Sequence, residues 1–275
     1  MKLARDLAEI EAVLLIEAVH HATGFDFREY APASIRRRIW QCVRNEGLRT
    51  ISGLQDRALH DPACMARLLR ALSVITSGMF RDPSFYRALR EQVVPLLREQ
   101  PFIYIWHPGC GAGEEVYSMV ILLEEVGLAG RCRLYATDMN EDALEAARRG
   151  VYPLSLMRGY TANYQKAEGA RAFSDYYSAA GDHAIFHAAL QKRVVWAAHN
   201  LVTDATFHEF HVVICRNVMI YFNLGLRDRV HELLYQSLAG SGVLGLGSHE
   251  SLRGTVRAAC YEALAEREKL YRKVR

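Results

Sequence analysis

The sequence predicts an α/β protein with a doubly wound, mostly parallel sheet, an all-α N-terminal domain and a small antiparallel insertion. Roughly the first eighty residues show helical apolar spacing and no β-rich run, whereas from residue 102 onward short apolar runs alternate with helical patterns. This alternation breaks between Tyr152 and Gln191. Because buried strands that alternate with helices form parallel sheets covered on both faces, a doubly wound sheet follows.

The composition is that of an ordinary globular protein. The chain has 275 residues, 51% of them hydrophobic and 24% charged, enough for one large domain or two unequal ones. Lys plus Arg exceed Asp plus Glu by 34 − 31 = 3, too small a surplus to indicate nucleic-acid binding. The six cysteines form no Cys-x-x-Cys pair, and no apolar run approaches the ~18 residues of a membrane span. We therefore expect a cytoplasmic protein with no nucleic-acid partner and no membrane insertion.

The all-α domain is expected to cover residues 1–75. Prolines near the start and glycines just past the end mark helix boundaries, as Pro32 and Gly47 do for the second helix and Gly24 does for the first. The expected helices span Leu3–Ala22, Pro32–Glu46, Ser52–His60 and Pro62–Leu72.

The α/β domain is expected to cover residues 76–275, with an insertion at about 157–191. A helix from Asp82-Pro83 to Glu99 precedes the first strand, and a hairpin is expected around Ala180-Gly181-Asp182. The strands are expected at residues 102–106, 133–137, 194–197, 211–215 and 243–247, and further helices at 114–126, 141–149 and 227–238.

A glycine-rich turn between the first strand and its helix is the strongest local signal. Gly109, Gly111 and Gly113 stand where the backbone must turn tightly or approach a ligand. The dinucleotide-binding pattern is broken, because Glu114 occupies the place of its third glycine. Glu114 and Glu115 would repel a pyrophosphate, so the sulfonium and ammonium groups of S-adenosylmethionine suit the turn better than NAD does. The alternative is a plain turn whose glutamates stabilise the helix.

A carboxylate ends the next predicted strand, twenty-five residues after Gly113. Asp138 can accept both hydroxyls of an adenosine ribose, as acidic residues do in nucleotide-binding α/β folds. It could also cap the helix that begins at Glu141. Together with the glycines, Asp138 favours a cofactor site.

Polar residues also follow the strand at 211–215. Arg216 and Asn217 would be costly in a core unless they touch something polar, so they indicate a site. Tyr221, four residues further on, fits either the core or the site. Arg81, in the joint between the two domains, could simply interact with its own helix.

These segments together resemble the CheR family of chemotaxis receptor methyltransferases, which esterify receptor glutamates with S-adenosylmethionine. The resemblance covers nearly the whole chain and implies a Rossmann-like class I methyltransferase sheet with Lys269–Val274 as its antiparallel edge strand. It implies a protein-glutamate O-methyltransferase. Its motifs, in the family's order, are an Arg-bearing second helix, Phe80–Pro83, Gly113–Glu115 with Tyr117-Ser118, Ala136–Asp138, Gly150–Tyr152, Asn200-Leu201, Cys215–Phe222 and Gly247–Glu250.

The resemblance also implies a role for each motif residue. Arg81 would act at the pocket of cofactor and substrate, and Tyr221 would aim the substrate carboxylate at the methyl group. Glu115 would lie beside the methionine part of the cofactor, and Asp138 would bind the ribose. Further cofactor contacts would come from Ser77 in the linker and from Gly109, Gly111 and Gly113 in the glycine turn. Asn200 and Leu201 would flank the adenine, and Asn217 and Val218 would line the pocket wall. Since a carboxylate is already ionised at pH 7, alignment rather than a strong base would drive the reaction.

Some residues depart from the family pattern. Ile75 stands where many members carry Asn, and Ser77 replaces Thr. The hairpin around Ala179–His187 is shorter than in members that hold a receptor's C-terminal peptide, which argues against such a tether.

A basic run lies in the second helix. Residues three and four apart share a helix face, so only part of Arg36-Arg37-Arg38 points one way. A solvated face is the plain alternative. The resemblance favours weak docking of these arginines on an acidic helical substrate, a chemoreceptor or a protein linked to a sensory kinase.

Two other functions remain open from the sequence. One is a non-catalytic S-adenosylmethionine-binding scaffold in a sensory complex, and the other is a methyltransferase that acts on a small molecule. No metal site is expected, because no histidine pair is joined by Cys or carboxylate residues at ligand spacing.

Overall fold

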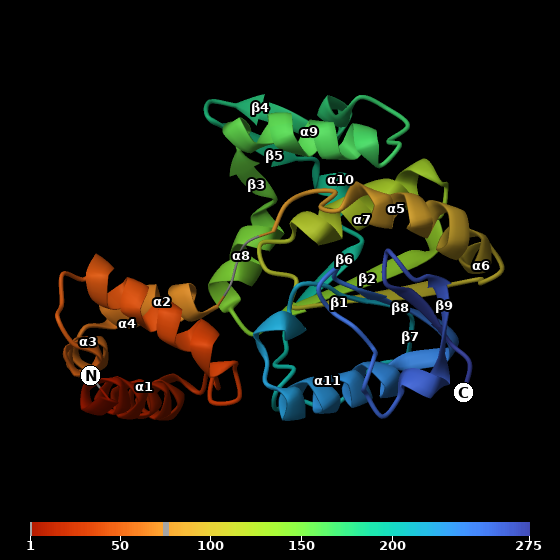
Figure 1. The fold of residues 1–275 in the computed structure, drawn as a ribbon. Coiled ribbons are helices and arrows are strands. Elements are labelled where there is room, and N and C mark those ends of the chain that lie inside the picture. Colours follow the sequence, from red (N-terminus) through yellow and green to blue (C-terminus); the bar gives the residue numbers. More distant parts are fainter. Residues whose placement is uncertain (1, 74–76) are drawn as a thin grey trace. The chain divides into compact units, whose positions relative to one another are not determined.

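The computed structural model describes residues 2–73 and 77–275. The chain divides into two compact units (Figure 1). The first, called the helical unit here, comprises residues 1–75 together with 221–227, and the second, the α/β unit, comprises residues 76–220 and 228–275.

The helical unit is a bundle of short helices whose ends are capped by their own sequence. Thr50 accepts a hydrogen bond from the Gly53 N–H, and Asp61 accepts one from the Ala63 N–H. The apolar faces of these helices fill the interior, where side chains such as that of Val19 are fully buried. The helices are α1 (Lys2–Thr23), α2 (Pro32–Asn45), α3 (Ile51–His60) and α4 (Pro62–Leu72).

The described residues of the α/β unit form a seven-stranded sheet in the order β6-β2-β1-β7-β8-β10-β9. Along this order, the neighbours β6, β2, β1, β7 and β8 run parallel to one another, and β10 runs antiparallel to both β8 and β9. The chain moves outward from β1 to β2 and β6 and then returns to β7, so the winding reverses between β1 and β7. The bounds are β1 (Ile103–Pro108), β2 (Cys132–Asp138), β6 (Val194–Ala198), β7 (Phe210–Cys215), β8 (Leu238–Leu246), β9 (Tyr261–Ala265) and β10 (Leu270–Lys273).

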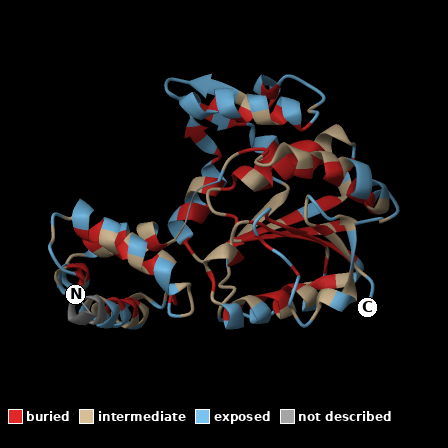
Figure 2. Ribbon diagram, in the orientation of Figure 1, coloured by how far each residue is buried: buried red, intermediate tan, exposed pale blue. Residues whose placement is uncertain are grey.

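Helices cover both faces of this sheet. Helices α5 and α7 lie on one side, and α11 lies on the other (Figure 1). The central strands and most of α7 are buried (Figure 2). The bounds are α5 (Pro83–Ala88), α6 (Val94–Arg98), α7 (Glu114–Glu125), α8 (Glu141–Arg149), α10 (Ala188–Gln191) and α11 (Leu224–Gln236), with 3-10 turns at Ala129–Arg131, Met219–Tyr221 and Ala258–Cys260.

A second, antiparallel sheet of order β3-β5-β4 joins the insertion to β3, which precedes the expected start of the insertion at about residue 157. Its hairpin turns at Gly181, which has a φ of +56°, at the place the sequence predicted. The buried carboxylate of Glu125 anchors the insertion, because it accepts hydrogen bonds from the Tyr176 hydroxyl and the Ala170 N–H, both at 2.9 Å. The elements are β3 (Val151–Pro153), the 3-10 turns Leu154–Leu156 and Phe173–Tyr176, α9 (Met157–Lys166), β4 (Tyr177–Ala180) and β5 (His183–Phe186).

Two features differ from the sequence predictions. The antiparallel strand expected at Lys269–Val274 exists as β10, but β9 lies outside it, because these strands form a hairpin in which β10 pairs with β8. The helix expected up to Glu99 is interrupted by a π-helical turn at Leu89–Val93. Pro95 follows two residues after this turn, and since it has no N–H and its ring crowds the carbonyl one turn back, the regular helix is interrupted before it.

Within the described residues, no helix combines the length and the apolar character needed to cross a bilayer. The cysteines are free thiols, and all are buried except the half-buried Cys260.

Candidate active site

The predicted site residues of the α/β unit converge on one edge of the large sheet. Strands β6, β2, β1 and β7 are parallel neighbours, so their carboxyl ends lie side by side. Asp138 is the last residue of β2, and the segments that follow the other three strands carry Asn200, the glycine turn and Asn217. In doubly wound sheets the ligand binds at this edge, where the winding reverses. We call this region the carboxyl edge.

The glycine turn has the geometry that only glycine tolerates. Gly109, Gly111 and Gly113 have φ values of +67°, +55° and +89°. A Cβ on Gly109 would lie 2.6 Å from Cγ2 of Val218, and a Cβ on Gly113 would lie 2.9 Å from Cβ of Ala147. The turn therefore has no room for side chains at these two positions, and the side chain of Val218 packs directly against Gly109.

Asp138 lies in this edge with both carboxylate oxygens engaged. The Gly111 N–H donates to Oδ2 and the Asn140 N–H donates to Oδ1, each at 2.9 Å. Burial raises the pKa of Asp138, and the N–H donors act against this rise. The Met139 N–H is a third donor to this carboxylate, and since an ionised carboxylate has about four acceptor sites, acceptor capacity remains for a ribose hydroxyl. Asp138 does not cap α8, because Asn140 occupies the N-cap and accepts from the Ala143 N–H.

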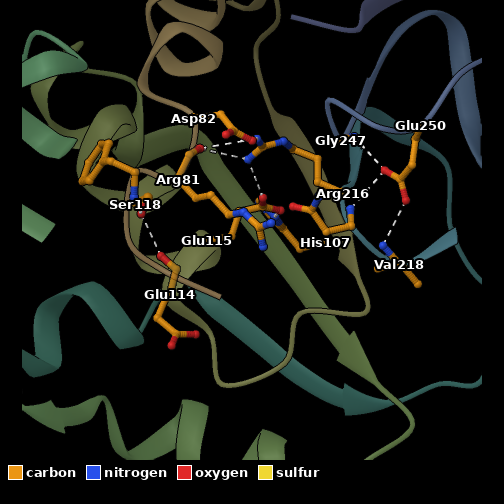
Figure 3. Close-up of polar contacts among 12 residues, drawn as sticks. Arg81, Asp82, His107, Glu114, Glu115, Ser118, Arg216, Val218, Gly247 and Glu250 are labelled. Atoms are coloured by element: carbon orange, nitrogen blue, oxygen red, sulfur yellow. Dashed lines mark hydrogen bonds and ion pairs between the residues drawn. The ribbon is translucent and has the colours of Figure 1, made fainter. Parts of the chain in front are cut away.

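Arg216 connects three segments that are far apart in the sequence (Figure 3). Its guanidinium donates to Glu115 Oε2 at 2.9 Å and to Asp82 Oδ2 at 2.6 Å. It also lies 4.1 Å above the centre of the Phe85 ring. Since only 1% of the Arg216 side chain is exposed, this ion-pair network is shielded from solvent. The sequence indicated a polar partner for Arg216 but could not identify these partners.

Glu115 is held on both oxygens. While Arg216 binds Oε2, the Nδ1 atom of buried His107 lies 3.3 Å from Oε1. Burial alone would raise the pKa of Glu115, but the hydrogen bond with His107 and the charge of Arg216 outweigh it, so this pKa lies below its ordinary value. Glu115 is therefore a fixed, ionised carboxylate at neutral pH. His107 was missed as a site residue, although its place at the end of β1 was a signal.

The segment around Arg81, which joins the two predicted domains, lies at the carboxyl edge. The Arg81 carbonyl lies 3.3 Å from Nη1 of Arg216, and the Phe80 N–H donates to Ser118 Oγ at 2.9 Å. Phe80 and Asp82 have positive φ values of +51° and +57°, so this segment follows an unusual backbone path. Ser77 is exposed, and Ile75 lies outside the described residues.

Asn200 and Leu201 follow β6 beside Asp138. Asp138 pairs in register with Ala198, and the Asn200 side chain accepts from the Val202 N–H at 2.9 Å. This local turn fixes the path of the chain at the predicted adenine-flanking pair. Both residues of the pair are partly buried.

Tyr221 and the basic run belong to the helical unit rather than to the cluster around Arg216. The Arg38 guanidinium lies 4.5 Å from the centre of the Tyr221 ring and donates to the Leu72 carbonyl at 2.6 Å. Arg36 forms an ion pair with Glu9. Arg37 is exposed and makes no hydrogen bond or ion pair among the described residues. Two of the three predicted docking arginines are thus engaged within their own unit.

The residues of the carboxyl edge fit S-adenosylmethionine. The Asn217 backbone is left-handed with a φ of +61°, and its side-chain Nδ2 is buried without a hydrogen-bond partner among the described residues. A buried amide without a partner is a group that a bound ligand satisfies. Glu115 is ionised, which is the charge state that its predicted place beside a cationic cofactor requires. Among residues 2–73 and 77–275, no group of three or more His, Cys, Asp or Glu residues could hold a metal ion.

Comparisons with known proteins place both units in one family. Residues 76–264 match the family model described as CheR methyltransferase, SAM binding domain, and residues 11–73 match the one described as CheR methyltransferase, all-alpha domain. A relative from Pseudomonas putida, which bears the methyltransferase name Cher3, is 46% identical over 265 residues, covering 96% of this chain and 97% of the relative.

More distant relatives carry the name chemotaxis protein methyltransferase. The one from Listeria monocytogenes is 24% identical and covers 89% of this chain and 91% of its own. Among solved structures, the N-methyltransferase NodS from Bradyrhizobium japonicum, in complex with S-adenosyl-L-homocysteine, is 17% identical with a TM-score of 0.35, covering 62% of this chain and 63% of NodS.

Proposed function

The chain belongs to the CheR methyltransferase family and carries its S-adenosylmethionine-binding domain, and from this premise we propose that it methylates glutamate side chains of a chemoreceptor or a related sensory protein. The names of the relatives support a role in chemotaxis, and the glutamate acceptor is the proposed part. A cytoplasmic location belongs to the same proposal, as does a boundary between the two functional domains at residues 75 and 76.

The observation that carries the proposal is the position of Arg81, whose backbone carbonyl accepts from the Arg216 guanidinium at an otherwise acidic edge (Figure 3). Glu114, Glu115 and Asp138 would repel an anionic substrate. Arg216 is buried and already pairs with Glu115 and Asp82, so Arg81 is the arginine that we propose to favour the approach of a carboxylate. An amine acceptor would instead require a base to remove its proton, whereas a glutamate is already ionised at pH 7.

The residues of this chain have positioning roles in the proposed reaction. The cofactor, when bound, supplies an electrophilic methyl group on its sulfonium. Asp138 holds the ribose through its free lone pairs, and Glu115 attracts the ammonium of the methionine part. Arg81 orients the substrate carboxylate, and the role of Tyr221 stays the one that the resemblance predicts. The rate enhancement then comes from proximity and alignment, because no proton has to be moved.

A methyl-transfer assay tests the acceptor. The full chain is incubated with methyl-labelled S-adenosylmethionine and the signalling fragment of a chemoreceptor from the same genome, and the labelled receptor is then treated with mild alkali. A glutamyl methyl ester releases its label as methanol, whereas a methylated nitrogen retains it. The proposal expects alkali-labile label that Tyr221→Phe and Arg81→Ala reduce.

Two results would contradict the proposal. Alkali-stable label would identify a different acceptor. Binding of S-adenosyl-L-homocysteine without transfer to any receptor fragment of that genome would indicate a non-catalytic scaffold.

A further inference from the structure

The carboxylate of Glu250 is surrounded by backbone N–H groups. Glu250 lies four residues after the end of β8 and is 5% exposed. Its Oε2 accepts from Gly247 at 2.7 Å and from Asn217 at 3.0 Å. Its Oε1 accepts from Val218 at 3.0 Å and from Met219 at 2.8 Å. Burial raises the pKa of Glu250, and these four N–H donors oppose the rise, so the hydrogen bonds favour its ionised form and hold the loop to it (Figure 3).

The turn at 217–219 depends on such a partner. Three consecutive N–H groups point toward one carboxylate, which is the arrangement of a backbone anion nest. Asn217 is left-handed, a conformation unfavourable for a residue with a Cβ. A Cβ on Gly247 would lie 2.7 Å from Glu250 Oε2 and 2.8 Å from the Asn217 nitrogen, so the carboxylate and the turn fit closely around a glycine.

The clamped turn forms one wall of the carboxyl edge. Val218 packs against Gly109 of the glycine turn, and Asn217 presents its unpartnered amide nitrogen. Both oxygens of Glu250 are occupied twice, and the residue is buried. Glu250 therefore acts on the site through the backbone of Asn217 and Val218.

We propose that Glu250 is a positioning residue for cofactor binding, which holds the backbone of residues 217–219 in the conformation that Asn217 and Val218 need to meet S-adenosylmethionine. The inference rests on the proposed cofactor contacts of these two residues. It assigns the Gly247–Glu250 motif a task that its sequence alone does not indicate.

The Glu250→Gln variant tests this role. A glutamine amide has one oxygen, so its NH2 group faces two of the four N–H donors and those bonds are lost. We expect the Kd of S-adenosyl-L-homocysteine, measured by calorimetry, to rise by about tenfold or more.

Glu125→Gln provides the matched control. Glu125 is also a buried carboxylate with several donors, but it anchors the insertion. We expect its substitution to lower the melting temperature by a similar amount and to change the Kd by no more than about twofold. Equal losses of affinity in the two variants would overturn the inference, because general destabilisation would then explain both.

Chemical rescue adds a readout that a purely structural role would not move. Glu250→Ala leaves the N–H groups of the turn around an empty space that a small carboxylate can enter. We expect millimolar formate to restore affinity for S-adenosyl-L-homocysteine in Glu250→Ala and to leave Glu125→Ala unchanged. Absence of rescue in a folded Glu250→Ala variant would count against the inference.

Hydrogen exchange on the native chain keeps the inference testable even where the variants do not fold. The N–H groups of residues 217–219 should be protected before any ligand is added. Exchange at the rate of an open loop would overturn the inference. If the native chain binds S-adenosyl-L-homocysteine and Glu250→Gln binds it equally well, only this inference fails, whereas a native chain that binds none contradicts the proposed function first.

Discussion

The carboxyl edge of the α/β unit and the basic face of α2 both concentrate charge, but they do so in different ways. At the carboxyl edge, Arg216 is buried and its partners Glu115 and Asp82 fix its geometry. On α2, Arg36 keeps 39% of its side chain exposed and pairs with the still more exposed Glu9. Buried charges interact strongly and are costly to separate, whereas exposed pairs contribute little. The first region is therefore preorganised, whereas the ion pair of the second holds its charges only weakly.

The largest difference between the regions should follow from removing one arginine from each. Arg216→Leu leaves Glu115 buried without its cation, so the free energy of unfolding in urea should fall by about 3–5 kcal/mol. Arg37→Ala on α2 should change it by no more than about 0.5 kcal/mol. Equal effects would mean that the network around Arg216 is not the shielded cluster described above.

Glycine-to-alanine changes provide a second comparison. Gly24, after α1, has a φ of +79°, and a Cβ added there would meet nothing within 4 Å, so Gly24→Ala should cost only the left-handed penalty of about 1 kcal/mol. Gly109→Ala meets Val218 as well, which should add about 1–3 kcal/mol and lower the affinity for S-adenosyl-L-homocysteine. Urea unfolding and calorimetry measure both effects. A native affinity in a folded Gly109→Ala variant would show that the turn does not contact the cofactor.

Within the carboxyl edge, two carboxylates should respond to acid in a fixed order. The pKa of Asp138 is raised by burial, so Asp138 takes up its proton first as the pH falls, above the ordinary range near ~3.9. The affinity for S-adenosyl-L-homocysteine should therefore fall there. The pKa of Glu115 is lowered, because His107 and Arg216 outweigh its burial, so its stabilising contribution is present above about 4.3 and is lost only as the pH falls through the lowered value.

Binding and unfolding measured over one pH series test this order, with Asp138→Asn as the control. The affinity of that variant should be weaker and nearly independent of pH. Loss of stability before loss of affinity would contradict the order.

The smallest effect is expected on α2. Arg37→Ala should slow methylation of a receptor fragment by about threefold at low salt, because an exposed charge at an interface mainly changes the association rate. Arg36→Ala should slow it less, since Glu9 already neutralises Arg36. Both differences should vanish at about 1 M salt, where the Debye length is only ~3 Å. A larger effect of Arg36 than of Arg37 would contradict the expectation that Arg37 is the arginine available for docking.

Much of the carboxyl edge could be predicted because its signals are local. A glycine that must adopt a positive φ is visible in the sequence, and so is an acidic residue at the end of a strand, as Gly113 and Asp138 show. The topology then brings these strand ends together without further information.

The partners of Arg216 could not be predicted, because residues 82, 115 and 216 meet only in the folded chain. The same holds for Glu250, three of whose four donors belong to a turn 31 to 33 residues earlier. Asn140 rather than Asp138 caps α8, a choice that depends on the local register of the chain. A charge run such as the one on α2 allows even less to be predicted, because burial and pairing in the folded chain decide which arginine is available to a partner.

The central claim is that the carboxyl edge binds the cofactor through Asp138. Calorimetric titration of the purified chain with S-adenosyl-L-homocysteine, repeated on Asp138→Ala, tests it most directly. The account predicts micromolar binding to the native chain and no detectable binding to the folded variant. A native chain that does not bind, or a variant that binds as tightly as the native chain, would contradict it.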